Sequence, residues 1–200
     1  MENNIKFSNG GGFKYFLGKE YYINSGSPLS FSYTSPYDNY WLLLNTYEYS
    51  NKNQSSRASL KINGTTIDRL VATDGSDDGT GTWASYIKNG CFVSKASKGD
   101  VCSFTMTFTY NMNYNFVFTV NKPNLIGSLA KPSSLTTTTL TSNKDLLIFV
   151  EGNGTEYSIS NAEYSVVYTQ NYLKMIYIPK TSSEITFTIT STGVMNIFEI

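Results

Sequence analysis

The residues whose types could support chemistry are few, and they are mostly acidic. The chain has 200 residues and contains no histidine. Serine–histidine and cysteine–histidine nucleophiles, the commonest general base, and most zinc and iron sites are therefore excluded. Carboxylate pairs of the glycosidase type remain, but the acidic residues stand mostly in turn-like segments, where they are usually solvated. The sequence predicts a protein that is not an enzyme.

An acidic stretch that starts at Asp74 partly matches a calcium-binding loop. Asp74, Ser76 and Asp78 place oxygen ligands at positions one, three and five, and a glycine follows at position six. Ser85 stands at position twelve, where such loops carry a bidentate glutamate. A different calcium site would combine these three residues with Asp68. The alternative is a metal-free Asp/Gly turn between strands, and no other cofactor is expected.

A second candidate site is aromatic. Tyr37, Tyr40, Trp83 and Tyr86 flank turn-like segments rich in Asp and Asn, as aromatic residues do on the rim of lectin-like sandwiches. Such rings stack on sugars, or they serve as large, rigid anchors at a protein interface. Both uses remain open. Trp41 precedes three leucines and is predicted to lie in a core.

The chain has two cysteines, Cys91 and Cys102. No basic and apolar leader precedes the first strand-like segment, so the expected state is two reduced, buried thiols. The two segments that carry them are joined by a Lys/Ser/Gly turn. A cross-strand disulfide is therefore the alternative.

The elements that position these residues are predicted to be strands. Tyr and Phe number 28 together (16 and 12), and Thr, Ser and Asn are abundant, a composition suited to half-buried pleated surfaces and their turns. Period-two alternation is clearest over residues 102–110, and no ten-residue stretch has helical periodicity. The predicted strands are 29–34, 40–49, 57–62, 65–71, 83–87, 91–95, 101–110, 114–120, 145–150, 155–160, 164–169, 173–178, 184–190 and 194–200.

These strands group into an all-β protein of two tandem antiparallel β-sandwiches, jelly-roll-like, with a short N-terminal leader. The predicted boundaries are 1–24 for the leader, 25–122 for the first sandwich, 123–144 for a Pro/Ser/Thr linker and 145–200 for a smaller second sandwich. The order and spacing of apolar segments agree between the two halves. The same topology is therefore expected twice.

Charge is sparse and balanced. Lys and Arg number 15, Asp and Glu number 15, and charged residues make up 15% of the chain. Such a surface has no electrostatic reason to bind nucleic acid or an anionic membrane. No run reaches the ~20 apolar residues of a membrane span, and no signal peptide is recognised. Synthesis in a cytoplasm is expected, with exit only by lysis or a route without a signal.

One pattern resembles a known group of modules. The segments Ile62-Asn63-Gly64-Thr65, Phe92-Val93-Ser94-Lys95 and Lys98-Gly99-Asp100-Val101, followed by an alternating strand, resemble jelly-roll modules of bacteriophage fibre, receptor-binding and capsid-decoration proteins. The resemblance covers about 60 residues of the first half. It implies a virion protein, made in the host cytoplasm, that forms a homotrimer. Residues 1–24 would dock on other virion proteins, and outward loops would bind a host-surface glycan. A soluble carbohydrate-binding module, or lectin, is the alternative.

Overall fold

A computed structural model describes residues 29–35, 37–51, 57–67, 71–74, 85–107, 111–119, 121–131, 135–152, 156–170, 173–190 and 193–200. Within these ranges the protein consists of sixteen strands in four antiparallel sheets, and no residue is helical. The predicted all-β fold class is therefore confirmed. The jelly-roll assignment stays a prediction, and the leader at residues 1–24 lies outside the described residues.

The first half of the chain builds two four-stranded sheets. In outer sheet 1 the strand order is β1 (Leu29–Thr34), β7 (Val101–Thr107), β3 (Arg57–Ile62) and β4 (Thr65–Ile67). In inner sheet 1 the strand order is β5 (Val71–Asp74), β6 (Ser85–Ala96), β2 (Tyr40–Asn51) and β8 (Asn111–Thr119). These two sheets form the first sandwich.

The second sandwich repeats this strand order. In outer sheet 2 the order is β10 (Thr136–Thr141), β15 (Glu184–Ile189) and β12 (Tyr157–Ser160). In inner sheet 2 the order is β13 (Ser165–Gln170), β14 (Leu173–Ile178), β11 (Leu146–Glu151), β16 (Gly193–Glu199) and β9 (Asn124–Lys131). Strands β10, β11, β12, β13, β14, β15 and β16 thus take the places of β1, β2, β3, β5, β6, β7 and β8. The expected repeat of topology is confirmed.

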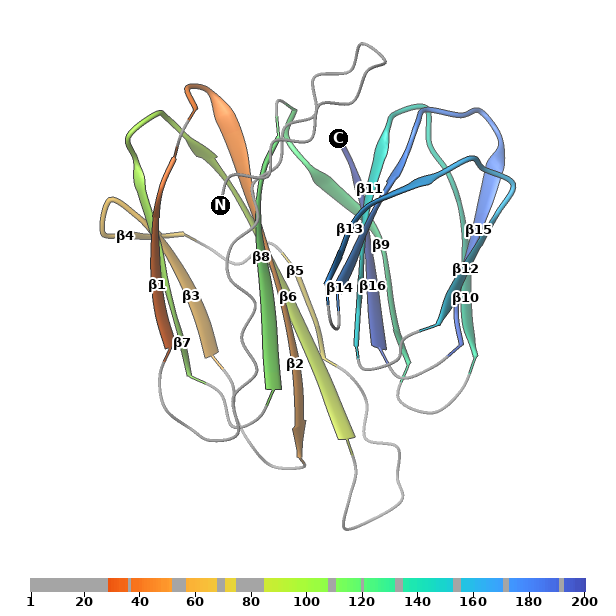
Figure 1. Cartoon of the computed structure of the whole chain (residues 1–200), viewed down its shortest axis with the longest axis horizontal. Coiled ribbons are helices and arrows are strands. Elements are labelled where there is room, and N and C mark those ends of the chain that lie inside the picture. Colours follow the sequence, from red (N-terminus) through yellow and green to blue (C-terminus); the bar gives the residue numbers. More distant parts are fainter. Residues whose placement is uncertain are drawn as a thin grey trace.

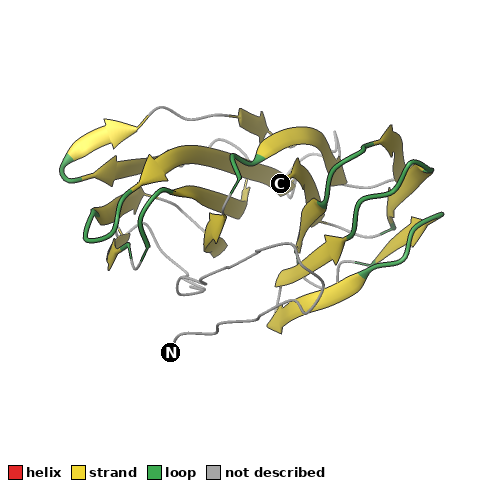
Figure 2. Ribbon diagram, turned by 90° about the horizontal axis from the view of Figure 1, so that it is seen from above, coloured by secondary structure: helices red, strands yellow, loops and turns green. Residues whose placement is uncertain are grey.

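The four sheets stack as layers, with the two inner sheets facing each other (Figure 1). A view from above shows the described strands with only loops between them (Figure 2). Three cores fill the spaces between layers. The first core lies inside the first sandwich, the middle core joins the two inner sheets, and the second core lies inside the second sandwich. The halves are therefore fused by a shared core.

Burial on both faces explains the two longest apolar runs of the sequence. On β2, Leu42 and Leu44 enter the first core, whereas Leu43 enters the middle core. On β11, Leu147 and Phe149 enter the middle core, and the alternate residues enter the second core. A strand buried on both faces has no water-facing positions, so it is a continuous apolar run.

A small polar network lies inside the middle core. Asn196 Nδ2 on β16 donates to Asn45 Oδ1 on β2 at 2.8 Å, and Ser128 Oγ on β9 donates to Asn196 Oδ1 at 2.8 Å. Cys91 Sγ donates to the same Asn45 oxygen at 3.2 Å. Buried polar groups that bind one another favour one relative placement of the layers. The network therefore helps to align the two inner sheets.

The two cysteines are buried, and no disulfide joins them. Cys91 faces the middle core from β6, whereas Cys102 faces the first core from β7 in the other sheet. This matches the expected reduced thiols and rules out the cross-strand disulfide, because β6 and β7 are not paired with each other. Burial, followed by the charge of Asp100, raises the pKa of the Cys102 thiol to about 11.

The predicted linker at residues 123–144 is wrong. β9 pairs with β16 in inner sheet 2, and β10 pairs with β15 in outer sheet 2. The tract looked polar because alternate threonines of β10 face outward, while Leu140 packs against the second core. Pro123 stands just before β9, where its missing N–H removes no bond from the ladder.

Two strand predictions also differ from the structure. The predicted strand 65–71 is divided, because β4 belongs to outer sheet 1 and β5 to inner sheet 1. Residues 85–87 and 91–95 of two predicted strands belong to one long strand, β6, which continues through Gly90 beside Thr46 of β2. Residues 83 and 84 lie outside the described residues.

Candidate functional site

Two of the four predicted aromatic ligand residues lie together beside the start of β2. The ring centroids of Tyr37 and Tyr40 are 4.6 Å apart, with the rings tilted by 40°. The ring centroid of Tyr37 also lies 6.2 Å from that of Phe118 of β8, in an edge-on contact. Both tyrosines are half-buried against the first core. Each ring is therefore held by packing while part of its surface stays accessible for stacking or for anchoring a partner.

The other aromatic predictions have different outcomes. Trp83 lies outside the described residues, and Tyr86 is placed only as a backbone position of β6 opposite Ser50. A platform that includes these two residues stays a prediction. Trp41 is half-buried and belongs to none of the three cores, contrary to expectation. The ammonium of Lys122 lies 5.4 Å from the Trp41 ring centroid, a cation–π contact at the edge of the stack.

Beside the tyrosines, a side-chain lock joins the β3–β4 turn to the β6–β7 turn. Asn63 Nδ2 donates to Asp100 Oδ1 at 2.8 Å, and the N–H of Val101 donates to Asn63 Oδ1 at 2.8 Å. The N–H of Ser97 donates to Asp100 Oδ2 at 2.8 Å. These bonds, first the one from Ser97 and then the one from Asn63, lower the pKa of the Asp100 carboxyl. The ionised form of Asp100 is thus favoured as a hydrogen-bond acceptor between the turns.

The β1–β2 connection is tied to the same place. The N–H of Ser35 donates to the Asp100 carbonyl at 2.8 Å, and the N–H of Gly99 donates to the Ser35 carbonyl at 2.9 Å. The N–H of Lys98 donates to Asp38 Oδ1 at 3.1 Å. The sequence did not predict this network, although its acceptor side chains, those of Asn63, Asp100 and Asp38, belong to residue types that are common in turns. Asn63, Gly99 and Asp100 belong to the sequence pattern that resembles phage modules, and in the structure they hold these turns together.

The predicted calcium site cannot be assembled from the described residues. Asp74 ends β5 and is placed only as a backbone position, while Asp68, Ser76 and Asp78 lie outside the described residues. Elsewhere in the described ranges, no three His, Cys, Asp or Glu side chains are grouped so that they could hold a metal ion. Calcium binding by the acidic loop stays a prediction.

The second sandwich has its own clamp at the start of β11. Tyr177 Oη donates to Asp145 Oδ2 at 2.7 Å, and the N–H of Lys180 donates to Asp145 Oδ1 at 2.8 Å. Burial, then the bond to Asp145 and its charge, raise the pKa of Tyr177 to about 12. Asp145 corresponds to Asp38, since each carboxylate precedes the central strand and accepts from a lysine N–H in the facing turn. The bond from a lysine N–H to an aspartate carboxylate is therefore present in both sandwiches.

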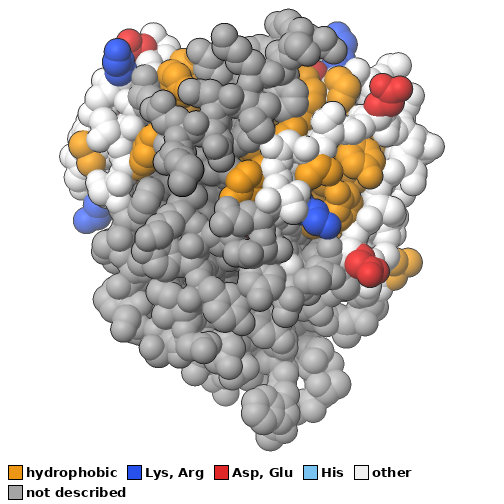
Figure 3. Space-filling model, in the orientation of Figure 1, with side chains coloured by type: hydrophobic (Ala, Val, Ile, Leu, Met, Phe, Trp, Pro, Cys, Tyr) orange, Lys and Arg blue, Asp and Glu red, His pale blue; other side chains and the backbone are white. Residues whose placement is uncertain are grey.

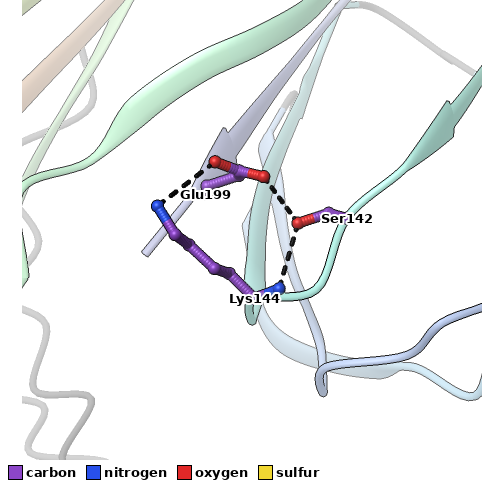
Figure 4. A network of polar contacts seen from close by, with 3 residues as sticks. All are labelled: Ser142, Lys144 and Glu199. Atoms are coloured by element: carbon purple, nitrogen blue, oxygen red, sulfur yellow. Dashed lines mark hydrogen bonds and ion pairs between the residues drawn. The ribbon is translucent and has the colours of Figure 1, made fainter.

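A neighbouring network fixes the last strand to the β10–β11 turn (Figure 4). Ser142 Oγ donates to Glu199 Oε1 at 2.7 Å, the N–H of Lys144 donates to Ser142 Oγ at 3.1 Å, and Lys144 Nζ lies 3.5 Å from Glu199 Oε2. The bond from Ser142 is the main cause that lowers the pKa of Glu199. The ionised carboxylate thus fastens the end of β16 to the turn.

Outer sheet 2 carries a regular array of hydroxyl groups on its outward side. Cross-strand register forms two rows, and the facing Oγ1 atoms are 3.1 Å apart for Thr137 and Thr188 and 3.5 Å apart for Thr139 and Thr186. β12 extends each row by one serine. This surface, called the hydroxyl face, comprises Thr137, Thr139, Ser158, Ser160, Thr186 and Thr188. None of these six side chains is charged.

The comparisons with known proteins give no relative for this arrangement. No model of a protein family matches the chain, and neither the curated proteins nor the solved structures give a significant match. In the part of the chain that the structure describes, no helix has the length and apolar character needed to cross a membrane.

Proposed function

We propose that the protein is a structural subunit of a bacteriophage particle: a head or tail fibre, a fibre-like protein or a capsid-decoration protein. It acts by assembly and by attachment to a host surface, not by catalysis. The observation that carries this proposal is that, within the described ranges, the four-layer stack leaves the outward sides of its two outer sheets uncovered. Both inner sheets are covered by the middle core, so the outward sides of the two outer sheets remain for contact.

The character of the outward surface supports contact between copies of the chain. The hydroxyl face is uncharged across its two rows, and threonines paired across strands present a regular surface of methyl and hydroxyl groups. On the face drawn in Figure 3, the described charged side chains stand singly or beside one of opposite sign. A surface without a strong field of one sign allows identical copies to approach.

The proposed assembly is tested by the mass of the full chain in solution. Light scattering is expected to give a homotrimer whose mass does not change on dilution. Thr137→Lys combined with Thr188→Lys places two like charges on the hydroxyl face of each copy, and we expect the trimer to dissociate. The control is Asn143→Lys, which adds a charge in an exposed turn away from this face. A native chain that stays monomeric at high concentration would contradict the assembly.

Docking on the particle is proposed to use the leader, residues 1–24, which lies outside the described residues. Deletion of the leader is expected to abolish incorporation into particles while far-ultraviolet circular dichroism of the remaining chain is unchanged. Incorporation of the shortened chain at the native level would show that another segment docks.

A soluble carbohydrate-binding module is the second candidate function. The Tyr37–Tyr40 pair favours it, because two packed rings with accessible surface are suited to stacking on a sugar ring. Under this reading the chain is a monomer, and Tyr37→Ala or Tyr40→Ala removes its glycan binding. A dilution-resistant trimer with unchanged glycan binding in both variants would rule this candidate out.

A further inference from the structure

The repeated topology allows the same pair of turns to be compared in the two sandwiches. In the first, Asn63 follows β3 and faces the β6–β7 turn; in the second, Asn161 follows β12 and faces the β14–β15 turn. Both asparagines have a left-handed backbone, with φ of 48° and 67°. The two places are therefore structural equivalents, and any difference between them concerns side chains.

The difference is that one place is filled and the other is hollow. In the first sandwich the Asn63 amide fills the space between the turns through its bonds to Asp100 and Val101. In the second, a depression of about 420 Å³ lies there, lined by Asn161, Ala162, Glu163, Pro179, Lys180 and Thr181. The second turn is one residue longer, spanning 179–183 where the first spans 97–100.

The hollow has a fixed frame. The backbone N–H of Lys180 is held by Asp145 Oδ1 at 2.8 Å, and Thr181 Oγ1 accepts from the N–H of Ser183 at 3.1 Å. Asp145 is itself held by Tyr177 Oη. A turn that is fixed by such bonds before a ligand arrives loses little conformational freedom on binding.

The functional groups in the hollow are available to a ligand. Among the described residues, no hydrogen bond or ion pair engages the Glu163 carboxylate or the Lys180 ammonium, and both side chains are exposed. Asn161 adds an amide, while Ala162 and Pro179 add apolar surface. The hollow thus combines donors, an acceptor and apolar surface.

This chemistry fits a neutral sugar. A carboxylate and an amide accept hydrogen bonds from sugar hydroxyls, an ammonium donates to them, and the apolar surface of Ala162 and Pro179 suits the C–H face of a pyranose ring. The opposite charges of Glu163 and Lys180 leave no net attraction for an ionic ligand. A volume of about 420 Å³ falls within the range of small-molecule sites and has room for a mono- or disaccharide.

We propose that this hollow, here called the β12–β15 hollow, is a binding site for a neutral saccharide. The inference rests on the proposed attachment to host surfaces, and it places the sugar contact in the second sandwich and away from the tyrosine pair of the first. Glu163 and Lys180 are the polar contacts.

The test uses the full chain and saturation-transfer NMR with the methyl glycosides of glucose, galactose, mannose and N-acetylglucosamine. At least one glycoside is expected to bind, and Glu163→Gln and Lys180→Met are each expected to weaken it about tenfold or more, since each removes a charge-assisted hydrogen bond. Glu184→Gln and Lys95→Met change exposed charges outside the hollow and are expected to bind like the native chain.

The outcomes separate the inference from the proposed function. If no glycoside binds, or if Glu163→Gln and Lys180→Met bind normally while their thermal unfolding is unchanged, the saccharide site is overturned. If binding is lost only with Tyr37→Ala, the sugar contact belongs to the first sandwich and the hollow is overturned as well. None of these results affects the trimer mass, which tests the assembly independently.

Discussion

Carboxylates in this protein serve as fixed acceptors at strand ends. Asp100, Asp145 and Asp38 each accept a hydrogen bond from a backbone N–H of a neighbouring turn, and Glu199 accepts one from the Ser142 hydroxyl. Such bonds favour the ionised form of the acceptor. For Asp100 and Glu199, whose carboxyl pKa values such bonds lower, the ionised form therefore contributes to stability.

Glu199 makes this testable through pH. Its folded pKa is lowered, so the ionised carboxylate stabilises the fold above the unfolded value of about 4.3, and this contribution is lost as the pH falls through the folded pKa. Glu199→Gln is expected to lower the free energy of unfolding by about 1 kcal/mol at pH 7 and by much less at pH 3. Urea unfolding at both pH values measures this.

Glu184→Gln is the matched control, because Glu184 is an exposed residue of outer sheet 2. Its effect on unfolding is expected to be small and similar at the two pH values. An equal loss of stability for Glu199→Gln at pH 3 and pH 7 would contradict the ionised acceptor.

At the scale of elements, the turn lock around Asn63 explains how the β1–β2, β3–β4 and β6–β7 connections meet at one end of the first sandwich. Asn63→Ala removes two side-chain hydrogen bonds and places alanine at a φ of 48°, a backbone region that disfavours it. We expect a loss of about 1–3 kcal/mol in the free energy of unfolding. Denaturant titration followed by tryptophan emission measures the loss.

Two further variants separate the causes. Asn63→Gly removes the same bonds but tolerates the left-handed backbone, so its cost is expected to be smaller than that of Asn63→Ala. Asn161→Ala, at the equivalent position with φ of 67°, carries the backbone cost without loss of a lock. If Asn161→Ala destabilises as strongly as Asn63→Ala, the lock contributes nothing measurable.

Much of the element pattern could be predicted from the sequence, because period-two alternation and turn residues are local signals. The β10 segment was missed for a physical reason. One side of an outer sheet faces water, so Thr136–Thr141 has a polar composition although Leu140 points inward. The repeat was recognisable because β2 and β11 are each buried on both faces. The contact between Asn63 and Asp100 was not, since 37 residues separate them and only the folded turns bring them together.

Only part of the candidate site could be predicted from the sequence. Tyr37 and Tyr40 are three residues apart, so their proximity follows from the turn before β2. The hollow between Asn161 and Lys180 has no sequence signal of its own. It lies at the place that Asn63 fills in the first sandwich, beside a turn that is one residue longer than its equivalent, and both features require the folded sandwiches.

At the scale of the whole molecule, the middle core decides how the protein behaves. Tandem sandwiches joined by a linker would each unfold separately, whereas a shared core couples them. Leu43, Cys91 and Val117 of the first half pack with Phe149 and Phe198 of the second. The two halves therefore form one stack that presents two outward surfaces, which suits the proposed display on a particle.

The most direct test of this claim is the unfolding of Phe149→Ala observed through tryptophan emission. Both tryptophans, Trp41 and Trp83, belong to the first half of the chain, while Phe149 belongs to the second. The substitution removes an aromatic ring from the middle core and is expected to cost about 3–5 kcal/mol. We expect the midpoints seen by tryptophan emission and by far-ultraviolet circular dichroism to shift together to lower denaturant. A tryptophan transition that stays at the native midpoint while the dichroism splits into two steps would contradict it.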